Sequence, residues 1–177
     1  MHRGGGAGAR AGRGAVTALR RALAGDLVDL RAFLRAADLT VDGLDAPGAG
    51  FWVERDGDGR VVGSAGLELG AGGRHALVRS VAVDPALRSS GRGSALARHA
   101  LAEAEAAGAE RAWLFSRRSG PFWRGLGFAE ADRDALAAAL PEAHQVVAFR
   151  ASGQLAREVA WSRVLGAGTT PPPRLAG

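Results

Sequence analysis

The sequence predicts a single mixed α+β domain in which a mostly antiparallel sheet is flanked by helices. Strand-like runs precede and follow the turn Asp56-Gly57-Asp58-Gly59, which is typical of a hairpin. A helical pattern over residues 91–107 lies between two further strand-like runs, so the second of these must return roughly parallel to the first. The 177 residues suffice for one domain with a sizeable core.

The first half predicts a strand, a helix and a three-stranded meander. Val16 to Arg20 is a short strand, and Asp26 to Ala37 has apolar residues at helical spacing with Asp26 as N-cap. A polar connection over residues 38–50 follows. The meander consists of a strand beginning at Phe51 and of strands over residues 60–69 and 76–83.

The second half predicts a crossover helix and several shorter elements. Apolar residues lie on one face of residues 91–107, and Gly108 ends that helix. The remaining expected elements are a strand over 111–115, a helical turn over 122–126, a strand near Phe128, a helix over 134–140 and a last strand over 158–164.

The two ends of the chain differ from the part between them. Residues 1–14 are rich in Gly and Arg, and residues 166–177 contain three consecutive prolines. Both are predicted to be disordered tails around a domain at residues 15–165. We find no apolar run long enough for a membrane span and no secretory signal. We therefore expect a cytoplasmic protein, and the abundance of Ala, Arg and Gly favours a bacterial source.

Three residue types are absent, and their absence excludes several chemistries. The chain has no Cys, Tyr or Lys. Disulfides, thiolate nucleophiles, phenolic acids and Schiff-base lysines are therefore excluded. The net charge of +5 comes largely from arginines in the tails, because residues 15–165 hold 19 Arg against 18 acidic residues. This near-neutral domain gives no argument for nucleic-acid binding, and no histidine spacing predicts a metal site.

The most informative stretch links a strand to a helix through a glycine-containing loop. Val81-Ala82-Val83 ends in Asp84-Pro85, and Arg88-Ser89-Ser90-Gly91-Arg92-Gly93 leads into the helix. Glycines allow a close backbone approach, and the first turn of a helix carries unpaired N–H groups and a partial positive charge. Together these features predict a binding site for a phosphate or diphosphate.

These residues resemble the acetyl-CoA motif of the GNAT N-acetyltransferases, Arg/Gln-x-x-Gly-x-Gly/Ala after a Val-x-Val strand. A second family pattern, Phe-Tyr-x-x-x-Gly-Phe, is matched by residues 122–128 with Trp123 in place of Tyr. The resemblance covers about residues 16–165 and implies the GNAT fold, a mixed sheet with a V-shaped splay. Residues 62–68 and 77–83 are similar to the subfamily encoded with bacterial arsenic-resistance genes, although this chain lacks the Cys-Pro that members often carry.

The resemblance also implies which residues hold acetyl-CoA, the expected co-substrate. The loop and first helical turn would bind the pyrophosphate, the strand would pair with the pantetheine amides, and two aromatic residues would pack nearby. The implied residues are Val81, Ala82, Val83, Arg88, Ser89, Ser90, Gly91, Arg92, Gly93, Ser94, Phe122 and Trp123.

Catalysis requires a base for the acceptor amine, and the leaving thiolate is commonly protonated by an acid. Glu68 is the predicted base, with a solvated strand-end carboxylate as the alternative. Trp123 replaces the tyrosine that usually serves as acid, so Ser116, Ser119 or water would take that role, or the thiolate would leave unprotonated. Arg79 and Arg117 are candidates for binding a substrate carboxylate, with ordinary surface arginines as the alternative.

The sequence thus predicts an acyltransferase that moves acetyl from acetyl-CoA to a primary amine of a small molecule, such as an amino-acid-like toxin or metabolite. Transfer would be direct, in a ternary complex. The alternatives are a non-catalytic acyl-CoA-binding module, which the Trp123 substitution favours, and a protein N-terminal acetyltransferase. We expect no nucleic-acid, membrane or metal partner, and a monomer or homodimer.

Overall fold

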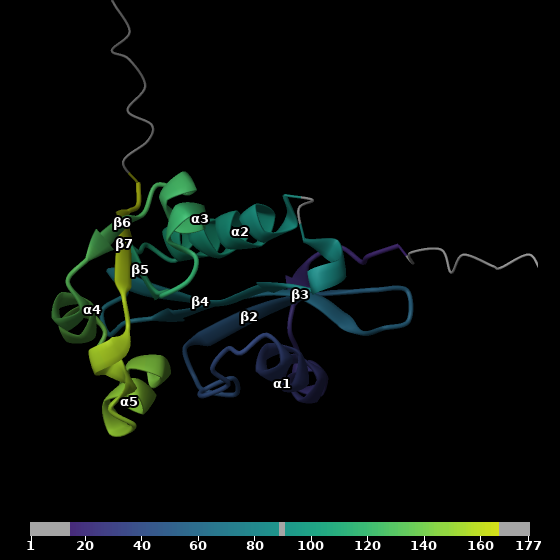
Figure 1. The fold of residues 1–177 in the computed structure, drawn as a ribbon, viewed down its shortest axis with the longest axis horizontal. Coiled ribbons are helices and arrows are strands. Elements are labelled where there is room, and N and C mark those ends of the chain that lie inside the picture. Colours follow the sequence, from purple (N-terminus) through teal and green to yellow (C-terminus); the bar gives the residue numbers. More distant parts are fainter. Residues whose placement is uncertain (1–14, 89–90, 167–177) are drawn as a thin grey trace, which may run out of the picture.

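The computed structural model describes residues 15–88 and 91–166, which form a seven-stranded sheet with helices on both faces (Figure 1). The tails predicted at 1–14 and 166–177 lie outside the described residues, apart from Gly166. The strands are β1 (Arg20–Arg21), β2 (Ala49–Arg55), β3 (Val61–Leu69), β4 (His75–Val83), β5 (Arg111–Phe115), β6 (Ala129–Ala131) and β7 (Ala160–Val164). The helices are α1 (Leu27–Ala36), α2 (Arg92–Ala106), α3 (Gly120–Gly125), α4 (Arg133–Ala139) and α5 (His144–Ala151), with 3-10 turns η1 (Ala24–Asp26), η2 (Pro85–Leu87) and η3 (Gln154–Arg157).

The strand order β1-β2-β3-β4-β5-β7-β6 confirms the predicted fold class. Strands β2, β3 and β4 form the expected antiparallel meander, and β5 returns parallel to β4 after the α2 crossover. Strand β7 inserts antiparallel between β5 and β6. Because the β4–β5 pair is the only parallel one in the described sheet, the junction of the two antiparallel halves lies there.

Two helical layers cover the sheet (Figure 1). Helices α2 and α3 pack on one face, where Leu96, Ala100 and Trp123 share a core with alternate residues of the central strands. Helix α1 covers β2 and β3 on the opposite face, and α4 and α5 cover β4, β5 and β7 there. Successive strand residues point to opposite faces, so each central strand contributes to a core on both sides.

The sheet opens between its two halves. Pairing of β4 with β5 is limited to residues 75–77 against 111–113, so the rest of β4 has no strand on that side. The register between β3 and β4 shifts near Ser80, which has a φ of +56°. A bulge of this kind bends a strand and increases its twist. The resulting split leaves backbone groups of Val81 to Val83 at an open edge.

Two local predictions need correction. The strand expected over Val16 to Arg20 contributes only Arg20 to the β1 ladder; Thr17 instead bonds Arg55 through its backbone N–H and its hydroxyl. Asp26 does not cap α1 with its side chain. Its buried carboxylate accepts hydrogen bonds from Arg20, Arg55 and the Leu23 N–H, and these bonds hold the pKa of Asp26 well below its ordinary value.

The sequence reading also missed a helix. Helix α5, followed by η3, occupies the stretch between the predicted helix near residues 134–140 and the last strand. Its amphipathic pattern is weak, which explains the omission. Among the described residues, no helix is long and apolar enough to cross a membrane.

Candidate functional site

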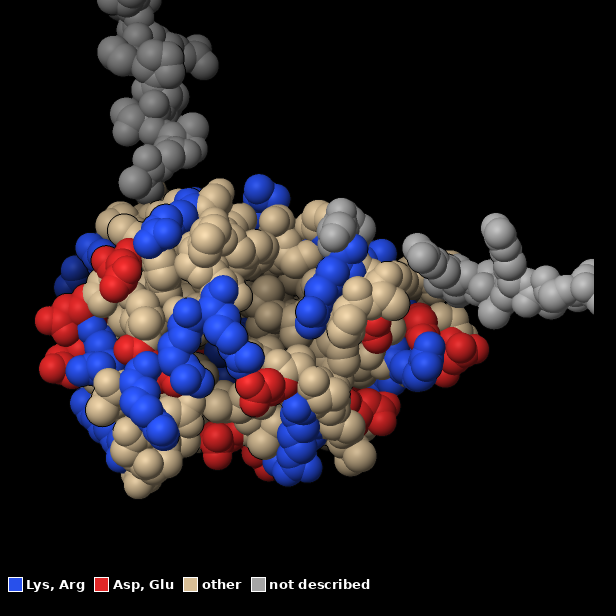
Figure 2. All heavy atoms as spheres, viewed as in Figure 1, with Lys and Arg blue, Asp and Glu red and all other residues tan. Residues whose placement is uncertain are grey.

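A cleft of about 590 Å³ lies where β4 and β5 separate. Figure 2 shows this face of the molecule, with arginine side chains gathered around a central hollow. We divide the lining into two walls. The strand wall consists of Val81, Ala82, Val83, Arg88, Gly93 and Phe122, and the helix wall consists of Leu39, Thr40, Gln145, Phe149, Gln154 and Glu158. Residues 115–119 join the two walls.

The strand wall combines an open strand edge with the beginning of a helix. Val81 to Val83 line the cleft where β4 has no partner strand. Gly93 lies in the first turn of α2, and a methyl group added there would lie 3.7 Å from the Phe122 ring. Free backbone N–H groups at both places can bind an extended chain of amides that ends in phosphates.

The glycine-containing loop is described again from Gly91, which has the left-handed conformation that favours glycine. Gly91 has a φ of +73° and is the N-cap of α2. Arg88 lines the cleft, whereas the Arg92 guanidinium lies 3.1 Å from Glu54, and neither Arg92 nor Ser94 lines the cleft. Ser89 and Ser90 lie outside the described residues.

Trp123 and Ser116 line a smaller pocket of about 130 Å³ that shares several lining residues with the cleft. Trp123 is buried between Phe122 and Phe128, with ring centroids 4.9 and 5.4 Å away. Ser116 lines both the cleft and the pocket, and its Oγ accepts the Ser119 N–H at 3.2 Å. Because the Ser116 hydroxyl donates no hydrogen bond within the described part of the chain, its proton is available to a bound group.

Glu68 is buried, and described residues occupy both of its carboxylate oxygens. Oε1 accepts from Arg79, while Oε2 accepts the His144 N–H at 2.7 Å and lies 3.0 Å from His144 Nδ1. Glu68 does not line the cleft or the smaller pocket. A role for Glu68 as base stays a prediction. Its contacts instead favour a structural role, because the carboxylate binds His144, the first residue of α5, and so holds that helix in position.

Arg79 and Arg117 occupy different places. Arg79 is buried, lines the smaller pocket and reaches the hydroxyl of Thr40 as well as Glu68. Its Nε has no hydrogen-bond partner among the described residues. Arg117 lines the main cleft and is half exposed, with its Nε 3.4 Å from Glu158. Of these two arginines, only Arg117 lines the main cleft. A carboxylate-binding role for either one stays a prediction.

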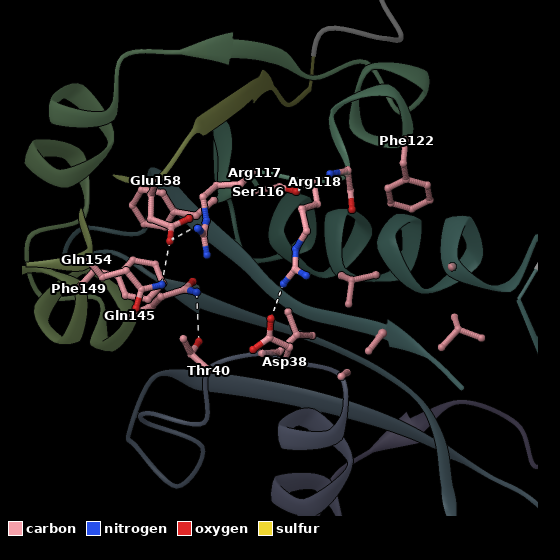
Figure 3. Close-up of a pocket in the computed structure, with 18 of the residues that line it drawn as sticks. Asp38, Thr40, Ser116, Arg117, Arg118, Phe122, Gln145, Phe149, Gln154 and Glu158 are labelled. Carbon is pink, nitrogen blue, oxygen red and sulfur yellow. Dashed lines mark hydrogen bonds and ion pairs between the residues drawn. The ribbon is translucent and has the colours of Figure 1, made fainter. Parts of the chain in front are cut away.

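The helix wall is the part of the site that sequence reasoning missed. Figure 3 shows Gln145 reaching Thr40, Arg118 reaching Asp38, and Glu158 between Gln154 and Arg117. These residues come from the connection after α1, the loop after β5, and the segment from α5 to η3. No short motif joins segments so distant in sequence, so only the fold brings them together.

Polar and charged groups of both signs face this cleft. Arg88, Arg117 and Arg118 line it together with Asp38 and Glu158, so the lining is close to neutral with a small positive excess. Such a lining suits an anionic ligand on one wall and a small polar ligand on the other. Within residues 15–88 and 91–166, no cluster of three or more His, Asp or Glu side chains could hold a metal ion.

Comparison with protein families gives a match to the acetyltransferase (GNAT) family over residues 16–128. A comparison with curated proteins finds no significant match. Solved structures with a similar fold include N-acetylglutamate synthase from Neisseria gonorrhoeae in complex with coenzyme A and N-acetyl-glutamate. It is 24% identical over 85% of this chain, with a TM-score of 0.68. This chain spans about a third of that protein, 35% of its length.

Two further structures match over nearly their whole length. An acetyltransferase of the GNAT family from Staphylococcus aureus is 16% identical, with a TM-score of 0.65, and covers 85% of this chain and 99% of its own. The Mycobacterium tuberculosis protein Rv2747, in complex with CoA, is 20% identical with a TM-score of 0.61 and covers 84% and 99%. At these identities the likeness concerns the fold, and it agrees with the mixed sheet described above.

Proposed function

The chain belongs to the GNAT acetyltransferase family and is an acyltransferase that uses acetyl-CoA, and from this premise we propose that its acceptor is the primary amine of a small molecule. One observation supports the proposal: a single cleft joins the strand wall to a helix wall lined by polar side chains. Donor and acceptor can therefore meet directly in a ternary complex. With no Cys in the chain, no thiol can carry an acyl-enzyme.

The strand wall would hold acetyl-CoA. The N-terminus of α2 would bind the pyrophosphate, and the open edge at Val81 to Val83 would pair with the pantetheine arm. A backbone N–H at that edge would polarise the thioester carbonyl. Ser116 would relay a proton from the reacting amine to the leaving thiolate, because the indole N–H of Trp123 is too weak an acid to replace a phenol and Ser116 lines the cleft.

The size of the cleft favours a small acceptor. A volume of about 590 Å³ would be shared by the end of the cofactor and the acceptor, and small-molecule sites typically have a comparable volume. The gonococcal synthase of similar fold is complexed with N-acetyl-glutamate, which is an acetylated amino acid. An amino-acid-like toxin or metabolite belongs to the class of small amines proposed here as acceptors. Membership of the arsenic-resistance subfamily stays a prediction.

Two measurements test the proposal. The first is calorimetric titration with acetyl-CoA and with CoA. The second is free-thiol release over a panel of small amines and a peptide with a free N-terminus. We expect binding of both cofactors and thiol release that depends on a small amine. Thiol release with the peptide alone would instead assign the enzyme to protein N-termini.

A further inference from the structure

Glu158 lines the cleft but lies far along the sequence from the cofactor motif at residues 81–93. It precedes β7 and is only 8% exposed, yet it lines the cleft. Its N–H donates to the Leu155 carbonyl, and the next residue accepts the Ser116 N–H at 2.9 Å. These backbone bonds fix a buried carboxylate beside the loop that joins the two walls.

The two oxygens of Glu158 differ in their surroundings. Oε1 accepts from Gln154 Nε2 at 2.8 Å and lies 3.4 Å from Arg117 Nε. No hydrogen bond or ion pair from the described residues involves Oε2, and this atom is not among the fully buried ones that lack a partner. The side chain is thus held in place by one oxygen while the other can accept a proton from a ligand, which Glu68 cannot do in its observed contacts.

A pair of aromatic residues lines the same cleft as this carboxylate. Phe115 and Phe149 line the same cleft with their ring centroids 5.3 Å apart. Phe115 pairs across the sheet with Ala160, two residues after Glu158. Aromatic rings beside a carboxylate favour an organic cation that carries an apolar group, because the ammonium gains both an ion pair and contact with ring faces.

We propose that Glu158 is a catalytic residue whose Oε2 binds the acceptor ammonium and takes its proton, and that the acceptor is a primary amine with a short aromatic or apolar substituent. This inference rests on the proposed function. Gln154 and Arg117 act as positioning residues, since both contact Oε1. Residue 158 lies outside every motif of the sequence, so only the cleft geometry identifies it.

The reaction balances with groups already present. Glu158 Oε2 accepts one proton from R-NH3⁺, and the neutral amine then attacks the thioester carbonyl. The C–N bond forms and the C–S bond breaks. The second proton lost from nitrogen reaches the thiolate through Ser116 or water, which gives the amide and CoA-SH. Glu158 returns its proton to solvent when the product leaves.

Two isosteric probes separate proton removal from binding. Phenethylamine is protonated near neutral pH, whereas O-benzylhydroxylamine, an alkoxyamine of the same shape, is already neutral. We expect Glu158→Gln to lower kcat/KM for phenethylamine about 100-fold and to change that for O-benzylhydroxylamine less than about threefold. Glu158→Asp, which keeps the carboxylate, should lose about tenfold or less with phenethylamine. The matched control is Glu130→Gln, an exposed glutamate outside the cleft.

Calorimetry with acetyl-CoA checks that each variant is folded and that its donor site is intact. If Glu158→Gln does not fold, Glu158→Asp is compared with the wild type on the two probes instead. Equal losses for both probes, or no loss, would overturn the role of Glu158. A wild-type enzyme that acetylates other amines but neither probe would overturn the acceptor class and leave the proposed function standing. Acetyl-CoA binding without thiol release from any amine would overturn the proposed function, and this inference with it.

Discussion

The strand wall and the helix wall of the cleft differ in how their residues are distributed along the chain. The strand wall comes mainly from one stretch between Val81 and Gly93 and offers mostly backbone groups. The helix wall comes from residues 39–40 and 145–158, more than 100 residues apart, and offers side chains. Backbone sites require particular local conformations, which leave a motif in the sequence. Side-chain sites require only that distant segments meet, so they leave none.

The largest effect should come from breaking the strand wall. Gly91 has a φ of +73°, and a glutamate there would add strain and a negative charge at the N-terminus of α2. We expect Gly91→Glu to weaken acetyl-CoA binding about 1,000-fold, or about 4 kcal/mol, by calorimetry. Gly108→Glu is the control, because Gly108 has a similar φ at the other end of α2. Normal affinity in a folded Gly91→Glu protein would remove this loop from the site.

The next effect concerns the support of the helix wall. Glu68→Gln would leave the buried Arg79 guanidinium without its charged partner, and we expect a loss of about 3 kcal/mol in the free energy of unfolding. Glu110→Gln, which breaks the exposed pair with Arg74, should cost less than about 1 kcal/mol. Urea denaturation measures both. Unchanged stability with a large loss of rate would instead support Glu68 as the base.

A third test concerns acid stability. The pKa of Asp26 is lowered in the folded protein, so its contribution is fully present above the unfolded pKa of about 3.9 and is lost as pH falls through the folded value. We expect wild-type stability to decline below about pH 4. Asp26→Asn should lower stability at pH 7 by roughly 2 kcal/mol and flatten that decline. Parallel acid profiles for the two proteins would exclude Asp26 as the source.

The smallest effect should sharpen the contrast between the walls. Thr40 Oγ1 accepts from Gln145 Nε2 at 3.1 Å and from Arg79 Nη2 at 3.3 Å. Thr40→Val should raise the acceptor KM about fivefold, or about 1 kcal/mol, and leave acetyl-CoA affinity unchanged. Thr17→Val, outside the cleft, is the control. A change in acetyl-CoA affinity alone would show that the walls are not independent.

Sequence reasoning captured the elements that have local signals. The hairpin at Asp56 to Gly59, the meander and the α2 crossover follow from turn residues and periodicity, and the structure confirms them. Helix α5 was missed because its pattern is weak, and with it Gln145 and Phe149. The burial of Arg79 was also missed, because a charged residue is expected at a surface until a buried partner such as Glu68 is known.

The open edge of β4 has a consequence for solubility. Unpaired strand edges are templates for aggregation, and proteins usually protect them with charges, prolines or covering segments. Here the edge is recessed between two halves of one sheet, with β5 closing one end and the wall of residues 145–158 facing it. We expect this recess to hinder pairing with a strand of another molecule while the cleft still admits a small ligand. The split therefore protects the free enzyme from association through this edge.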